Sequence, residues 1–537
     1  MTCSVVFMRS SLGFSGFGHH RVIALSDGPP GARMAAVTEH PRLAELVAAL
    51  SLATDLGMGQ PMEQGLRTCL VAVALADLAG ADAEMLAEVY YAALLRFLGC
   101  TADAHDTAVS VGGDDIALRR AIAPVLGGSS VEFLRGVLPV VGAGAPAARR
   151  PMLVARMLLQ GRERARTGVR AHCEAAEVLA TRLGLPERVR VALAGGFEQW
   201  NGAGLPNGVA GEAIPFSARV VAIARDAEVL NRVGGPALVE SALAERTAYD
   251  PALAELARRN LGDLAAAATR ADPWEAVLSL DPNPQTLVLD LEAAFEVLAD
   301  FADLKSPYFA GHSRAVSALA SAADHGHADL LRQAGLVHDL GRVAVPSGVW
   351  ARPEPLSVSD FEVVRLHPYY TERILARIPG TAALVRVAGL HHEHLDGSGY
   401  HRGAVATEIP YPARVLAAAD TWATLTEARP HRPALTSQAA TANLRALATS
   451  GKLDSDAVEA VLAVADRRPG RRVRGGLSQR ELEVLRLLCH GATKKDVAAA
   501  LVISPTTADH HTRHIYAKIG VHSRAAATLY AADHGLL

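Results

Sequence analysis

The segment HHEHLDGSGYHRGAVATEIPYPARV, residues 391–415, follows the same pattern as GFEQWNGAGLPNGVAGEAIPFSARV, residues 196–220. Three glycines, one glutamate, an Ile-Pro pair and an Ala-Arg-Val triplet recur at a fixed displacement of 195 residues. The same displacement relates His172 to His367, so the register extends upstream. Self-similarity at a fixed spacing is typical of a duplicated structural unit. The sequence therefore predicts two copies of one domain.

The composition predicts that these copies are helical. Half of the residues are hydrophobic and only 5% are aromatic, with alanine and leucine abundant, a mixture that favours helix over sheet. We therefore expect an all-α protein. Its predicted parts are a disordered N-terminal extension (1–39), a degenerate first copy (40–245), a linker (246–284), the second copy (285–435), a helical and basic linker (436–473) and a C-terminal module (474–537).

Cysteine usage and hydropathy bear on the compartment. The five cysteines are scattered without paired spacing, which suits a reducing environment. No apolar run approaches ~20 residues, the length that a membrane-spanning helix needs. We therefore expect a cytoplasmic protein without a membrane partner.

The second copy gathers residues that bind divalent metal ions. Five histidines and two aspartates fall in separated segments: His312, His338, Asp339, His367, His391, His392 and Asp420. Imidazole and carboxylate suit Fe, Mn, Zn or Co, and the lack of clustered cysteine argues against a structural zinc site. The set predicts a hydrolytic centre with two divalent ions, for which we favour Fe or Mn.

This copy resembles the HD-GYP family of metal-dependent phosphodiesterases over about 130 residues. The motifs that carry the resemblance are GHSR (311–314), HDLG (338–341), His367-Pro368, HHE (391–393), DGSGY (396–400) and AAD (418–420). The resemblance implies a helical fold in which Asp339 bridges both ions. It further implies two ligand sets, one of His312, His338 and Asp420 and the other of His367, His391 and His392. Cleavage of a phosphodiester is the implied reaction, with Asp339 and Arg342 as its catalytic residues.

The same resemblance points to residues that contact the substrate. Arg429 and Arg432 fall where the family places cations that hold nucleotide phosphate, and arginine is well shaped for that contact. Tyr400 lies in the glycine-rich loop. We assign these three residues to substrate binding, with cyclic di-GMP or a related nucleotide as the ligand.

Three positions depart from the family pattern. His401 replaces the proline of Gly-Tyr-Pro, and Arg342 replaces a lysine, which keeps the charge but does not readily donate a proton. Tyr308 stands where some members with three metals carry a glutamate ligand, so two metals are expected. The substitutions leave two hypotheses open, hydrolysis of the nucleotide or binding of it without significant turnover.

The first copy has lost most of this set. The replacements are Gly196-Phe197 for the histidine doublet, Arg225 for Asp420 and Arg96-Phe97 for His338-Asp339, and no histidine between residues 41 and 104 stands for His312. A site that loses its ligands and gains cations cannot hold two divalent ions. We expect a catalytically dead copy that serves as scaffold or pseudo-dimer partner or, alternatively, senses a ligand.

The C-terminal part predicts contact with nucleic acid. Residues 467–537 carry twelve Arg or Lys and five Asp or Glu, on a chain whose net charge is −3. Ser478 and Glu481 form a predicted capping box, and Ser504-Pro505 starts a second predicted helix. From residue 476 the chain resembles the four-helix LuxR-type helix-turn-helix module.

The helix after Ser504 is the expected recognition helix. Ala508, Ile515 and Ile519 recur at helical spacing and should face the core, which leaves another face for double-stranded DNA. On that exposed side, Asp509, His510 and Arg513 match positions that reach base edges in the family. Phosphate contacts are expected from Lys495, Thr506, Thr507 and Lys518.

The combined prediction is a transcriptional regulator that acts as a homodimer on DNA and carries a two-metal phosphodiesterase-like domain. In one hypothesis the centre hydrolyses a cyclic dinucleotide. In the other it is a catalytically weak sensor that controls DNA binding. A DNA-binding protein with an inert body is the third and most distant alternative.

Overall fold

A computed structural model describes residues 40–288, 290–465 and 476–537. The predicted N-terminal extension (1–39) and the arginine-rich part of the predicted basic linker (467–472) lie outside the described residues. The described residues form helices and loops, with no β-strand among them and only isolated bridges. The expected all-α class is confirmed.

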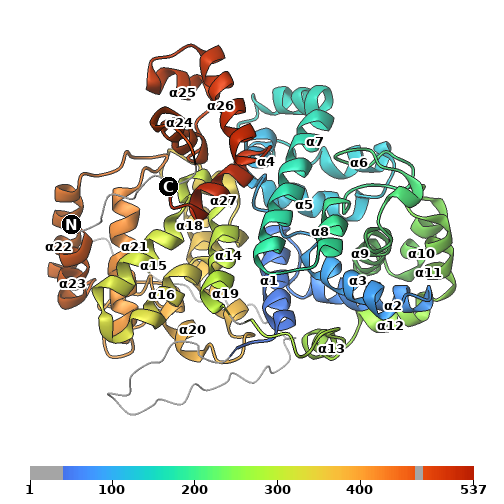
Figure 1. Ribbon diagram of the computed structural model, residues 1–537, viewed down its shortest axis with the longest axis horizontal. Helices are drawn as coiled ribbons and strands as arrows, with labels where there is room; N and C mark the ends of the chain where they lie inside the picture. The colour runs from blue at the N-terminus through green and yellow to red at the C-terminus, as the bar shows by residue number, and fades with distance from the viewer. Residues whose placement is uncertain (1–39, 289, 466–475) are drawn as a thin grey trace, which may run out of the picture. The chain divides into compact units, whose positions relative to one another are not determined.

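The first repeat is built from helices that Figure 1 shows in blue to green. In chain order they are α1 (Leu43–Gly57), α2 (Gln64–Leu78), α3 (Ala83–Leu95), α4 (Ala104–Val111), α5 (Asp115–Ile122), η1 (Ala123–Val125), α6 (Ser130–Val137), α7 (Arg150–Arg182), α8 (Glu187–Ala194), η2 (Gly211–Ala213), α9 (Phe216–Gly234) and α10 (Pro236–Glu245).

The second repeat runs from yellow to orange in the same figure. Its helices are α14 (Leu291–Asp303), η3 (Pro307–Phe309), α15 (His312–Ala323), η4 (His325–His327), α16 (Ala328–Val337), η5 (Leu340–Ala344), α17 (Ser347–Trp350), α18 (Val358–Arg365), α19 (His367–Leu375), α20 (Ala382–Gly389) and α21 (Tyr411–Thr426), followed by α22 (Ser437–Thr449) and α23 (Ser455–Ala465).

The duplication seen in the sequence is also present in the helices. Helices α8 and α20 begin 195 residues apart, and so do α9 and α21. Within the first repeat α3 packs against α8 and α9, and within the second α16 packs against α20 and α21. The buried faces of α9 and α21 are rich in alanine and valine, small side chains that let neighbouring helices approach closely.

The predicted linker at 246–284 contains three helices, α11 (Pro251–Arg259), α12 (Leu261–Ala268) and α13 (Pro273–Ser279). Arg219 of α9 pairs with Asp250, which caps α11. Arg414 of α21 pairs in the same way with Asp454, whose carboxylate accepts from the N-terminal turn of α23. Helix α11 therefore takes the place in the first repeat that α23 takes in the second.

A buried ion pair joins the two repeats. Lys305 Nζ lies 2.7 Å from Asp115 Oδ2, and neither side chain has any exposed surface. The second oxygen of Asp115 accepts from the backbone N–H of Ser347 at 2.7 Å. Because a buried charge is tolerated only with good partners, this contact ties α5 firmly to the loop that follows α14 and to the start of α17.

The C-terminal module contains α24 (Gln479–Cys489), α25 (Lys494–Leu501), α26 (Pro505–Ile519) and α27 (Arg524–Asp533), the four helices that the sequence predicted. The predicted capping box of Ser478 and Glu481 is present. Leu482, Ala508 and Ile515 are buried in the core of the module. Among the described residues, no helix combines the length and the apolar character that crossing a membrane requires.

Candidate metal centre

The seven predicted ligands come together from five places in the second repeat. Six of them lie at or near a helix end. His312 starts α15, His338 and Asp339 follow α16, His367 starts α19, and His391 and His392 follow α20. The seventh, Asp420, lies within α21. Six of them are buried, and His392 is partly exposed, with 23% of its side chain accessible. The centre therefore opens to solvent on the side of His392.

The carboxylate of Asp339 lies between two groups of side chains. Its Oδ2 atom faces His338 Nε2 at 2.9 Å and His312 Nε2 at 3.4 Å. Asp420 Oδ1 completes this group, 3.1 Å from His312 Nε2 and 3.8 Å from His338 Nε2. The four residues form a cluster compact enough to surround one ion.

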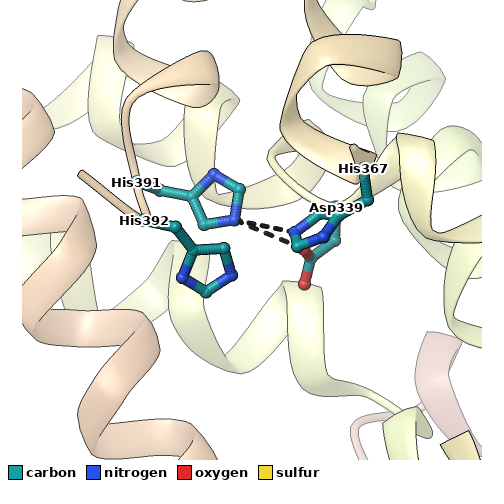
Figure 2. Close-up of side chains that lie close together, drawn as sticks. All are labelled: Asp339, His367, His391 and His392. Atoms are coloured by element: carbon teal, nitrogen blue, oxygen red, sulfur yellow. Dashed lines mark hydrogen bonds and ion pairs between the residues drawn. The ribbon is translucent and has the colours of Figure 1, made fainter. Parts of the chain in front are cut away.

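The Oδ1 atom of Asp339 faces the other group. It lies 3.2 Å from His367 Nε2 and 3.5 Å from His391 Nε2, while these two nitrogens are 3.3 Å apart. Figure 2 shows the imidazoles of His367 and His391 meeting at Asp339, with His392 beside His391. These four residues form a second compact cluster, which shares Asp339 with the first.

Backbone contacts hold three of the imidazoles in one orientation. The Nδ1 atoms of His338, His367 and His391 lie 2.9, 2.7 and 2.6 Å from the carbonyl oxygen of the residue three positions earlier. Because a carbonyl only accepts hydrogen bonds, each Nδ1 carries a proton, and in the neutral form of each imidazole the lone pair lies on Nε2. The three lone pairs point toward Asp339.

The donor set fits divalent metal ions. His338 Nε2 and both oxygens of Asp339 are buried and have no hydrogen-bond partner with acceptable geometry, despite their short separations. Buried polar atoms without partners are rare, and their convergence on two points indicates groups arranged for a ligand. Imidazole and carboxylate are ligands that Fe, Mn and Zn accept, so these residues could hold such ions.

Neighbouring charges and burial shift the pKa values of the residues in both clusters. Burial by itself would lower the pKa of His312, but the carboxylates of Glu427, Asp339 and Asp420 raise it well above its ordinary value. Burial opposes ionisation of Asp339, yet the charges of Arg342 and His338 hold its pKa well below its ordinary value. On the other side, burial lowers the pKa of His367 to about 4. The shared carboxylate is thus ionised and the imidazole of His367 is neutral at neutral pH.

Glu427 is a functional candidate that the sequence reasoning missed. Its carboxylate oxygens lie 2.9 and 3.1 Å from His312 Nδ1, so they orient the imidazole whose Nε2 faces Asp339. A carboxylate behind a histidine ligand fixes the tautomer and raises ligand basicity. The signal was present, because Glu427 follows Asp420 by only seven residues, a distance of about two helical turns, and it caps the end of α21.

Arg342 reaches the centre directly. Its Nη1 atom lies 2.5 Å from Asp339 Oδ2, and its guanidinium lies over the ring of Phe309 at 4.5 Å. The predicted catalytic position is therefore adjacent to the shared carboxylate. A cation at this place stabilises the ionised form of Asp339 and competes with an ion for the same oxygen.

The predicted substrate contacts lie in three different settings. Tyr400 is beside His392, with ring centres 4.8 Å apart, on the open side of the centre. Arg429 pairs with Glu427 at 2.8 Å and lies over the ring of Phe309. Arg432 donates to the backbone carbonyls of the loop at 424–433. Tyr400 faces the opening, whereas the two arginines are engaged within the protein.

The first repeat places different residues at the corresponding positions. Gln64 starts α2 as His312 starts α15, and Arg96 follows α3 as His338 follows α16. His172 is retained, but its Nε2 atom contacts the carbonyl oxygen of Arg96 at 3.2 Å, and burial lowers its pKa to about 3. The two clusters of metal-ligand type found among the described residues both lie in the second repeat.

The predicted DNA contacts lie on α25 and α26. Lys495, Thr506, Thr507, His510 and Arg513 are exposed. Two other predicted contacts have partners within the module. Asp509 pairs with Lys494 and Arg513. Lys518 Nζ lies 2.7 Å from the carboxylate of Glu481, which is in the first turn of α24.

Two protein families match this chain. Residues 155–251 and 296–457 match the HD domain family, and residues 476–531 match the family described as bacterial regulatory proteins, luxR family. The first of these matches falls on both repeats, and the second falls on α24 to α27.

Individual proteins extend the comparison. The chain is 29% identical over 413 residues to 3′3′-cGAMP-specific phosphodiesterase 3 of Vibrio cholerae serotype O1, covering 73% of this chain and 88% of that protein. It is 36% identical over 138 residues to the cyclic di-GMP phosphodiesterase response regulator RpfG of Xanthomonas campestris, covering 25% of this chain and 35% of that protein.

A crystal structure of a cyclic GMP-AMP-specific phosphodiesterase of Vibrio cholerae has the same fold, with a TM-score of 0.54 at 24% identity. The match covers 80% of this chain and 99% of that one.

Proposed function

We propose that this chain, which joins two HD-domain repeats to a LuxR-family DNA-binding domain, is a DNA-binding regulator whose second repeat binds two divalent metal ions and hydrolyses a cyclic dinucleotide. The observation that carries the proposal is the pair of buried four-residue clusters sharing Asp339. The matches to cyclic dinucleotide phosphodiesterases support the substrate class. The exposed face of α26 supports binding of double-stranded DNA.

In this proposal each cluster holds one ion, of Fe or Mn, and Asp339 is shared by both. A pair of such ions supplies positive charge that stabilises the attacking and leaving oxygens of a phosphodiester. The protein contributes orientation, because the carbonyl contacts at Nδ1 and the carboxylate of Glu427 hold the imidazoles in place. Burial of all ligands but His392 restricts water to one side.

The nucleotide would enter beside His392 and meet Tyr400 there. The ring of Tyr400 offers a flat apolar surface against which a base or ribose can lie. Arg429 is the arginine nearer to the centre, since it contacts Glu427 behind His312. We assign the phosphate contact to Arg429. Arg432 donates to several loop carbonyls, so its contribution would be to hold that loop.

One observation favours a second function, that of a sensor with little turnover. Arg342 Nη1 is 2.5 Å from the shared carboxylate, and arginine does not readily give up a proton. In that case the centre binds metal and nucleotide, and occupancy changes DNA binding without hydrolysis. The two functions differ in product formation and agree in metal content.

Contacts between α27 and the repeats offer a route from the centre to DNA. Arg314, two residues after His312, pairs with Asp300 at 2.8 Å and with Asp533 of α27 at 3.3 Å. Leu529 of α27 is buried in the same hydrophobic core as both repeats. A ligand shifts the module only if it binds one arrangement more tightly than the other, and this linkage gives such a difference a physical path.

The test uses the full chain purified without oxygen, with metals counted per chain. The protein is then incubated with Mn or Fe and with 3′3′-cGAMP or cyclic di-GMP in separate reactions. About two metals and a linear dinucleotide are expected. Two metals without product, together with nucleotide-dependent binding to duplexes selected from a random pool, would establish the sensor. A chain that binds no metal would overturn both functions.

A further inference from the structure

A buried arginine in the first repeat has no partner for most of its side chain. Arg96, which follows α3, is 7% exposed, and its Nε and Nη1 atoms are buried without a hydrogen-bond partner. The rings of Phe97 and Phe197 lie 5.8 and 5.4 Å from its guanidinium carbon. Aromatic faces attract a cation but satisfy none of its N–H groups.

A second buried arginine lies on α9, the helix that packs against α3. Arg225 of α9 is 3% exposed, and its Nε atom is also buried without a partner. Its Nη1 atom pairs with the adjacent carboxylate of Asp226, whose other oxygen accepts from the hydroxyl of Tyr249 at 2.6 Å. That carboxylate is therefore already engaged and leaves the N–H groups of Arg96 unsatisfied.

These two cations stand where the second repeat gathers its metal-ligand clusters. Arg96 occupies the position of His338 and Arg225 the position of Asp420. The same pair of helices, α3 with α9 and α16 with α21, brings each pair together. Two cationic side chains thus stand in the first repeat at positions that hold candidate metal ligands in the second, and a buried positive charge calls for an anion.

The first repeat also keeps the opening of the site. The exposed member of the second cluster is His392, and its counterpart Phe197 is likewise partly exposed. Glu198 holds the following loop by accepting from the backbone N–H groups of Asn207 and Val209. Glu393 accepts from the matching N–H groups in the second repeat, so both loops have the same anchor.

We propose that the first repeat binds a phosphoryl group between Arg96 and Arg225, past the edge of Phe197. Planar guanidinium groups with several free N–H donors match the geometry of phosphate oxygens, and a tetrahedral anion can accept from both side chains at once. The phosphoryl group belongs either to inorganic phosphate or to a nucleotide. This site would need no metal, because the protein itself supplies the positive charge.

The test measures binding of inorganic phosphate and, separately, of 3′3′-cGAMP to the full chain stripped of metal by a chelator. Removing metal prevents the second repeat from holding phosphate through ions. We expect one phosphoryl ligand per chain in calorimetric titration, and affinity at least tenfold weaker for Arg96→Met. The matched control is Arg188→Met, an exposed arginine of the same repeat paired with Glu84, which should bind as the parent does.

Melting temperature gives a second readout. Without anion, Arg96→Met should melt higher than the parent because it removes an unsatisfied buried charge, and phosphate should raise the melting temperature of the parent alone. Arg96→Lys keeps the positive charge but loses the planar guanidinium group, so this variant should bind phosphate more weakly than the parent. It replaces Arg96→Met in the test if the methionine variant misfolds.

The two ligands distinguish the sources of the phosphoryl group. Binding of phosphate alone identifies a free-anion site, and tighter binding of 3′3′-cGAMP identifies a nucleotide site. Absence of saturable binding of either ligand, or equal binding by the parent and the Arg96 variants, would overturn the proposal. The metal content of the second repeat is measured independently, so failure here leaves the proposed function standing.

Discussion

The two repeats keep the same framework and place opposite charges at its centre. In both, a buried glutamate anchors the glycine-rich loop, and an arginine of the Ala-Arg-Val triplet pairs with a helix-capping aspartate. The second repeat directs imidazole and carboxylate groups inward, whereas the first directs Arg96 and Arg225. The contacts that hold this fold together are therefore separate from the groups that line its centre.

The largest effect should come from the shared carboxylate. Asp339→Ala removes a ligand from both clusters, so we expect metal content to fall from about two ions per chain to near zero. Turnover should fall by roughly a thousandfold, as loss of several kcal/mol of charge stabilisation implies. Metal analysis and product formation measure both quantities.

The matched control for that change is Phe97→Ala, at the corresponding position of the first repeat. It should lower stability by opening a cavity but leave metal content and turnover intact. Metal loss in this variant would mean that the two centres are not separable.

Removing either glutamate that anchors a glycine-rich loop should lower the free energy of unfolding by a similar amount, but only one of the two changes should affect metal content. Glu198→Ala and Glu393→Ala each leave two backbone N–H groups without an acceptor, which should cost roughly 2–4 kcal/mol of stability. Thermal unfolding of the full chain should show similar decreases for both variants.

Metal analysis of the same two variants then sharpens the comparison. Only Glu393→Ala should lose metal, because His391 and His392 directly precede its anchor. Equal metal content in both variants would show that the loop anchor has no part in arranging the doublet.

A smaller effect is expected behind His312. Glu427→Gln keeps the size of the side chain but removes the charge that orients the imidazole, so metal affinity should fall by about 10- to 100-fold. Competition with a chromogenic chelator measures it. The corresponding residue of the first repeat is Arg232, which is exposed and pairs with Glu228, and Arg232→Gln should leave metal affinity unchanged.

The smallest effect concerns the docking of α27, to which each repeat contributes one arginine. Arg182 of α7 makes two contacts with α27, an ion pair with Asp533 and a hydrogen bond to the carbonyl of Leu529. Arg314 of α15 makes one contact with this helix, an ion pair with Asp533. Single alanine variants should speed amide exchange in α27 by about three- to tenfold, with Arg182→Ala the larger of the two.

The control for docking is Glu483→Ala, because Glu483 pairs with Arg480 inside the C-terminal module. It should leave exchange in α27 unchanged. If neither arginine variant changes that exchange, these two ion pairs do not hold the helix, and its docking rests on the pair of Arg524 with Asp106 and on the apolar contact of Leu529.

Local sequence patterns were sufficient for the class of the fold and for the seven metal-ligand candidates, although not for Glu427. The displacement of 195 residues predicted the duplication, and Ser478 with Glu481 predicted the start of α24, since capping depends on residues only three positions apart. Residue types alone identified the seven metal-ligand candidates, because imidazole and carboxylate carry their chemistry wherever they lie. The stretch at 246–284 offered no such pattern, and its three helices were not foreseen.

From its sequence alone, this protein could be predicted to be helical, duplicated and equipped with the residues of a candidate metal centre. Tertiary structure decided which atoms meet: the two oxygens of Asp339 facing separate clusters, Glu427 behind His312, and Arg96 buried without a partner. These outcomes depend on distances between helices that lie far apart in the chain. Helix packing sets those distances, and no periodicity within one helix encodes them.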